Sequence, residues 1–167
     1  TTSQPQELYE RLAPYIGYTT LMSSTQGYIH RAEYVGKRLN GRNAVHAGTS
    51  DGVPMNASPR KFGLLAPENP WYQQCVDAGE KVAKDGGYPY KSRIAYKLDF
   101  NTLSNQAASI VAKLKSEKIT SVICGCDAAL PLFLTSKAQE QGYSPEWIIT
   151  GAGFTDIDVV GQLYQQD

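Results

Sequence analysis

A short apolar strand, a polar loop and a helix follow one another three times in this 167-residue chain, and a fourth strand comes after them. This alternation constrains the fold more than any other feature, because strands separated by helices pair in parallel through right-handed crossovers. We therefore predict an α/β fold built on one doubly wound parallel sheet. The predicted strands cover residues 62–66, 94–98, 119–123 and 147–150.

The predicted helices carry apolar residues at helical spacing and have recognisable ends. Asn69 is a candidate N-cap with Pro70 at the first helical position, and that helix ends at Gly86-Gly87. The other helices are predicted at residues 25–39, 103–115 and 130–141. Residues 43–59 are rich in Gly, Ser, Asn and Pro and predict a surface loop, which we interpret as decoration.

The composition limits which classes of protein this chain can belong to. Sixteen basic and sixteen acidic residues cancel, so no net field favours a nucleic-acid partner. No apolar stretch approaches the roughly 18 residues that span a bilayer. The chain begins at Thr1 and not at Met, from which we expect a processed protein or part of a longer one. Residues 1–18 are interpreted as a connector, and residues 19–167 as a single α/β lobe.

The three cysteines leave several interpretations open. Cys124 and Cys126 point to the same side of a strand, and their spacing lacks the second ligand pair of a structural zinc site. They are interpreted first as small buried residues at a strand end. Cys75 could reach either one in a disulfide. Neither a metal nor a cofactor is expected.

The loop after the third strand is the first place to look for function. Ligands of open α/β sheets lie beyond the carboxyl ends of the strands, and residues 124–128 occupy that position. Asp127 would either contact a ligand there or cap the following helix. No glycine-rich phosphate loop follows any strand, which argues against nucleotide binding.

The order of several motifs resembles the C-terminal lobe of type I periplasmic binding proteins, the branched-chain amino acid uptake class. The motifs are Arg60 to Leu65, Glu68-Asn69-Pro70-Trp71-Tyr72, Asp99-Phe100, Ile110 to Leu114 before Thr120 to Ile123, Ala138 to Gly142, and Pro145-Glu146-Trp147. Ser23 to Gly27, followed by Ala32 to Val35, looks like the helix that enters this lobe. The segment from Gly41 to Gly48 and the residues around Tyr143 to Trp147 look most like actinobacterial homologues.

The resemblance implies a Rossmann-like lobe that helps to bind a small polar solute, an amino acid or related compound, for an ABC importer. It implies three partners: the solute, an N-terminal lobe supplying about half of the contacts, and a membrane permease. It also implies an extracellular or periplasmic location, tethered to the membrane through a preceding N-terminus. The acid that the family places against an amino group has no counterpart among Thr150 to Gly153, which argues against an α-amino acid.

The resemblance also suggests ligand-binding residues. The family's aromatic contact falls on Trp71, with Tyr72 adjacent, and a second contact falls on Asp127 or Ala128. Glu68, Asn69 and Phe154 complete the candidate set. Three of these have a plainer interpretation: Trp71 would pack under its loop, Glu68 would be a solvated acid, and Asn69 would be a helix cap.

Two other functions use the same fold. A sensor or regulator would couple closure of the lobes to a partner protein instead of a permease. A small Rossmann-like thiol enzyme would use Cys126 with Asp127, although only His30 and His46 offer a histidine base and both lie far away in sequence. We expect a binding protein without catalytic residues.

Overall fold

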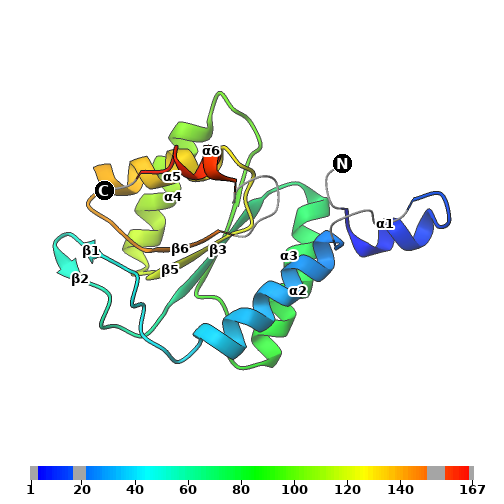
Figure 1. The fold of residues 1–167 in the computed structure, drawn as a ribbon, viewed down its shortest axis with the longest axis horizontal. Helices are drawn as coiled ribbons and strands as arrows, with labels where there is room; N and C mark the ends of the chain where they lie inside the picture. The colour runs from blue at the N-terminus through cyan, green and yellow to red at the C-terminus, as the bar shows by residue number, and fades with distance from the viewer. Residues whose placement is uncertain (1–3, 17–21, 150–156, 166–167) are drawn as a thin grey trace. The chain divides into compact units, whose positions relative to one another are not determined.

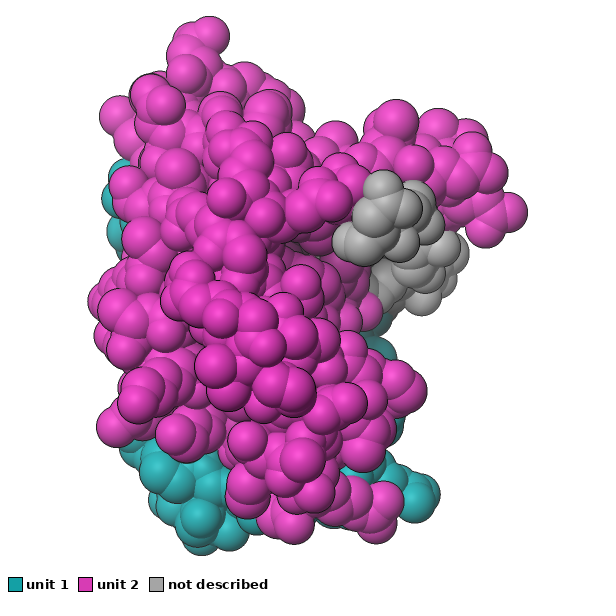
Figure 2. All heavy atoms as spheres, turned by 90° about the vertical axis from the view of Figure 1, so that its left-hand side faces the viewer, with its two compact units in different colours: residues 1–40, 68–89 teal, residues 41–67, 90–167 magenta. Residues whose placement is uncertain are grey.

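The computed structural model describes residues 4–16, 22–149 and 157–165. The chain divides into two compact units, coloured separately in Figure 2. Unit 1 comprises residues 1–40 and 68–89, and unit 2 comprises residues 41–67 and 90–167. Each unit is described by itself below.

Unit 2 is built on a four-stranded parallel sheet (Figure 1). Its strands are β3 (Phe62–Pro67), β4 (Ser92–Tyr96), β5 (Ser121–Cys124) and β6 (Glu146–Ile149), in the order β4-β3-β5-β6. All three pairings are parallel, as predicted. The chain steps from β3 to one side and then returns past it to β5 and β6, which is the reversal that defines a doubly wound sheet. The predicted fold class is confirmed.

Both faces of the central strands are buried. Every residue of β3 and β5 is buried, and successive side chains of a strand point to opposite faces. This explains why both strands have continuous apolar sequences and not an alternation of apolar and polar residues. The predicted bounds of β4 were displaced by two residues, because its first residues, Ser92 and Arg93, are polar although they pair with β3.

The core of unit 2 lies between one face of this sheet and two helices, α4 (Leu103–Ser116) and α5 (Leu130–Glu140). Figure 1 shows both helices beside β5 and β6. The approach of α4 is close at Gly63 of β3: a Cβ there would lie 2.9 Å from Leu114 and 3.1 Å from Ile119.

A short helix, α6 (Asp158–Gly161), comes after β6 in the chain. Beyond it, the Gln165 amide donates to the hydroxyl of Thr135 on α5.

The segment predicted as a decorative loop, residues 43–59, is more ordered than expected. It contains a two-stranded antiparallel hairpin, β1 (Thr49–Ser50) and β2 (Val53–Pro54). Three apolar residues of this segment are buried in the core of unit 2: Ala44, Ala47 and Met55. Most of the segment is exposed, as predicted for a surface loop. Its contribution to the core was not predicted, because apolar residues spaced between Gly and Ser give no periodic signal.

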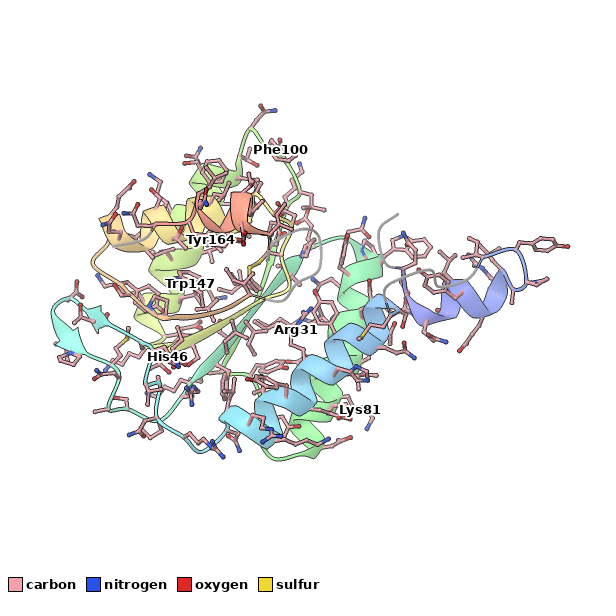
Figure 3. All side chains as sticks on the ribbon, viewed as in Figure 1. Arg31, His46, Lys81, Phe100, Trp147 and Tyr164 are labelled. Atoms are coloured by element: carbon pink, nitrogen blue, oxygen red, sulfur yellow. A yellow bond between two sulfur atoms is a disulfide. The ribbon has the colours of Figure 1, made fainter. Side chains whose placement is uncertain are left out.

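A buried ion pair fixes the amino-terminal end of the sheet. The guanidinium of Arg60 donates to both carboxylate oxygens of Glu146, over 2.7 and 2.8 Å, and both side chains are 6% exposed. The Ser121 hydroxyl and the His46 amide donate to the same carboxylate over 2.7 and 2.9 Å. His46, labelled in Figure 3, is itself exposed although its amide is held by this carboxylate.

Unit 1 is helical. It contains α1 (Gln6–Arg11), α2 (Ser24–Tyr34), a short π-helix η1 (Val35–Leu39) and α3 (Pro70–Asp85). Together, α2 and η1 account for the helix predicted at 25–39, and α3 has the predicted cap, because the Asn69 side chain accepts the Trp71 amide over 3.0 Å. The segment predicted as an irregular connector contains α1. Among the described residues, no helix is long and apolar enough to cross a membrane.

Candidate ligand-binding site

A pocket of about 190 Å³ lies within unit 1. Its lining is uncharged and combines two aromatic rings with amide and hydroxyl groups. The lining residues are Gln4, Pro5, Ser24, Asn69, Trp71 and Tyr72. Three of the predicted site residues are therefore brought together, and Trp71 remains 46% exposed, with part of its ring open to contact. Gln4, Pro5 and Ser24 were not predicted, because they come from a part of the chain that carries no strand-end signal.

The pocket lies where two helices begin. The Thr25 hydroxyl of α2 is 3.5 Å from the Cys75 sulfur of α3, and a Cβ on Gly79 would lie 2.7 Å from the Tyr28 carbonyl oxygen. These contacts advance along both helices together, so α2 and α3 run parallel, as Figure 1 shows. Parallel helices place their amino-terminal ends, with their partial positive charge, at the same end of the pair.

Elsewhere in unit 1, a cation is stacked on an aromatic ring. The Arg31 guanidinium carbon is 4.4 Å from the centre of the Tyr28 ring. Burial raises the pKa of the Tyr28 hydroxyl, and the neighbouring Arg31 charge opposes that rise. The Nε and Nη1 atoms of Arg31 are buried and donate to no acceptor among the described residues. The stacking offsets part of that desolvation cost.

Asp127 organises the turn after β5 in unit 2. One carboxylate oxygen accepts the amides of Ala129 and Leu130, over 2.7 and 3.1 Å, as an N-cap side chain does for α5. The other oxygen accepts the Tyr96 hydroxyl over 2.5 Å, and the Asp127 amide donates back to that hydroxyl over 3.0 Å. Asp127 thus holds the two amides at the start of α5, as a capping side chain would, although Ala129 is the residue that directly precedes the helix. Its ligand role stays a prediction.

The cysteines pair differently from the suggested bridge to Cys75. Cys124 and Cys126 form a disulfide, and Cys75 is a buried free thiol on α3. The two sulfurs meet because both residues project to the same side and pack against the core of unit 2. While its sulfur is bonded to Cys124, Cys126 offers no thiolate. Among the described residues, no cluster of three or more His, Cys, Asp or Glu side chains could hold a metal ion.

The remaining predicted residues divide between the units. Glu68 is exposed in unit 1, whereas Asp127 belongs to unit 2. Phe154 lies outside the described residues. The common concavity predicted for Trp71, Tyr72, Asp127 and Phe154 therefore stays a prediction. Tyr96 was missed, because its contact with Asp127 joins residues that are 31 positions apart.

Comparisons with known proteins show a likeness of fold to solved structures. No protein-family model matches the chain, and no curated protein does. Among solved structures, the chain is similar to an ABC transporter solute-binding protein from R. palustris, determined in complex with 4-hydroxybenzoate. The two are 13% identical with a TM-score of 0.55 over 83% of this chain. The chain spans 33% of the length of that protein. At this identity the likeness shows the fold.

Proposed function

We propose that this chain is the C-terminal lobe of a type I solute-binding protein, and that it helps to deliver a small solute to an ABC importer. The observation that carries the proposal is the pocket between the first turns of α2 and α3, where Trp71, Tyr72 and Asn69 meet. The fold likeness supports the class, since that neighbour is itself a solute-binding protein.

The lining suggests what the pocket accepts. Its two aromatic rings suit a flat or apolar part of a solute, and its amide and hydroxyl groups suit neutral or hydroxyl-bearing polar atoms. No charged side chain lines it. We therefore favour a small solute with an apolar face over a free α-amino acid. We also propose that the protein has an actinobacterial origin, as its sequence resemblance suggests.

The pocket is small for a complete site. Ligand pockets usually enclose about 300 to 1,000 Å³, against about 190 Å³ here. A second lobe closing over the open part of Trp71 would supply the missing contacts, which agrees with a chain that spans a third of its structural neighbour. In this proposal the protein works outside the cytoplasm and passes its solute to a membrane permease, without catalysis.

Tryptophan fluorescence in the parent two-lobed protein tests the proposal. The chain has two tryptophans, so Trp147→Phe leaves Trp71 as the reporter within this lobe. Titration with aromatic acids, amino acids and neutral aromatic alcohols should change Trp71 emission for one class. Calorimetry, which needs no tryptophan reporter, should then show that Trp71→Ala weakens binding of that class by about tenfold, the worth of a stacked aromatic contact.

Tyr34→Ala is the matched control. Tyr34 is another exposed aromatic residue on a helix of unit 1, and it does not line the pocket. Its replacement should leave affinity unchanged. Equal losses in Trp71→Ala and Tyr34→Ala, or full affinity in both, would remove the pocket from the binding site. We expect the isolated chain to bind weakly or not at all, because one lobe leaves one side of the solute in water.

A further inference from the structure

The Cys124–Cys126 disulfide closes a ring around a single residue, Gly125. Cys124 is the last residue of β5 and pairs with Leu65 on β3 and with Ile149 on β6. The Gly125 amide also donates to the Leu65 carbonyl oxygen, over 2.9 Å. One end of the disulfide is therefore fixed in the sheet, and the other end is held on the turn.

A ring this short contributes less to the stability of the whole fold than a longer one would. The entropy that a disulfide removes from the unfolded chain grows with the length of the loop that it closes. A loop of three residues removes about half of what a 15-residue loop removes. We therefore look for a further, local effect of this disulfide on the conformation of the turn that Cys126 begins.

That turn determines how α5 begins. Cys126 directly precedes Asp127, whose amide and carboxylate together hold Tyr96, Ala129 and Leu130. Tyr96 is 2% exposed and is fixed on β4, so the geometry of Asp127 must match a rigid partner. A change in the backbone at Cys126 would move Asp127 away from the hydroxyl and from the two amides at once.

We propose that the Cys124–Cys126 disulfide is a thiol–disulfide exchange site that controls the capping turn at Asp127. The reaction partner is a dithiol. One thiolate of the dithiol attacks the Cys126 sulfur, which forms a mixed disulfide and releases the Cys124 thiolate. The second thiol of the dithiol then displaces Cys126. Two electrons and two protons pass to the protein, which gains two thiols, and the dithiol becomes a disulfide.

The direction of attack follows from exposure. Cys124 is buried in the strand, whereas Cys126 is only partly buried on the turn and is the sulfur that a dithiol can approach. Cys75 does not compete as a thiol: it is fully buried on α3, and burial raises the pKa of its thiol. The exchange reaction is the same whichever solute the protein binds.

Differential alkylation of the full chain tests the site. The native chain, purified without reductant, is incubated with increasing dithiothreitol, alkylated with excess N-ethylmaleimide at neutral pH without denaturant, and weighed. We expect no labels before reduction and two after it, on Cys124 and Cys126, with Cys75 labelled only after denaturation. Labels on Cys124 and Cys126 before reduction would overturn the proposal.

Hydrogen exchange tests the effect on the turn. Reduction should speed exchange of the Ala129 and Leu130 amides by about fivefold, the loss of one side-chain cap, while the Leu65 and Ile110 amides keep their protection. Unchanged exchange at Ala129 and Leu130 would show that the disulfide does not control the turn. Loss of protection at all four amides would make it a purely structural bridge and overturn the proposal as well. Cys126→Ser, which cannot form the disulfide, should show the same exchange rates as the reduced native chain. If this variant does not fold, the exchange rates of the reduced native chain are the test.

Discussion

Replacing Glu146 by glutamine should destabilise the fold far more than the loss of one charge on the surface would. The Glu146 carboxylate receives four donors: two nitrogens of Arg60, the Ser121 hydroxyl and the His46 amide. A glutamine has one acceptor oxygen, so its NH₂ group would face two of these donors. Ser121 can rotate its hydroxyl, whereas the His46 amide and the Arg60 guanidinium cannot become acceptors.

The expected cost follows from burial. Both partners are 6% exposed, so Glu146→Gln leaves the Arg60 charge buried without a counter-ion. Removing one partner of a buried pair costs about 3 to 5 kcal/mol. Replacing both partners, in the double variant Arg60→Met with Glu146→Leu, should recover most of that loss, because no unpaired charge is then buried.

The same carboxylate should make stability depend on acid. Burial raises the pKa of Glu146, but the hydrogen bonds from Arg60, Ser121 and His46 outweigh burial and hold the pKa below its usual value. A carboxyl with a lowered folded pKa contributes stability above its unfolded pKa of about 4.3, and the contribution is lost as pH falls through the folded value. The difference in unfolding free energy between native chain and Glu146→Gln should therefore narrow below about pH 4.

Urea unfolding followed by circular dichroism measures these differences. Glu140→Gln is the matched control, since Glu140 pairs with Lys137 over 2.8 Å on the surface and its loss should cost at most about 0.5 kcal/mol. A cost for Glu146→Gln as small as that of the control would refute the reasoning. So would a gap between native chain and variant that stays constant from neutral pH to pH 3.

Other substitutions test local packing and capping. Gly79→Ala should destabilise by about 1 to 3 kcal/mol, because its Cβ would lie 2.7 Å from the Tyr28 carbonyl oxygen. Gly27→Ala should instead stabilise by up to about 1 kcal/mol, because nothing lies within 4 Å of the added Cβ and alanine favours the helix. Thermal melts compare the two variants, and melting temperatures that shift in the same direction would contradict the close contact at Gly79. Asp127→Ala should cost about 1 kcal/mol and Asp127→Asn much less, as denaturant midpoints would show, because asparagine also caps a helix. Equal costs would point to the Tyr96 contact instead of the cap.

The parts of the fold that depend on local pattern were predictable. The strands around Leu64 and Val122 are continuous apolar runs, and the cap at Asn69 is visible within three residues of sequence. The parallel order then follows from strand and helix alternation, which needs no contact information. Three of the residues that line the pocket, Asn69, Trp71 and Tyr72, were among the candidates that the family resemblance suggested.

The unpredicted parts depend on contacts between distant residues. The Arg60 and Glu146 side chains are 86 positions apart, and neither carries a local sign of its partner. The Cys124–Cys126 bond needed the side chains to be placed, since the spacing alone also fitted unpaired thiols. Ser24 reaches the pocket only because α2 and α3 run parallel, a relation that helix periodicity cannot give.

The division of the chain has a practical consequence for dissecting it. Unit 1 consists of residues 1–40 and 68–89, so the backbone passes from one unit to the other at three places. No single cut yields either unit as a continuous polypeptide, and a fragment that ends at residue 67 would contain β3 without any of its partner strands. Separate expression of unit 2 would need a short linker joining Pro67 to Tyr90 in place of α3. Such a deletion tests whether the sheet assembles when the helix that connects its first two strands is gone.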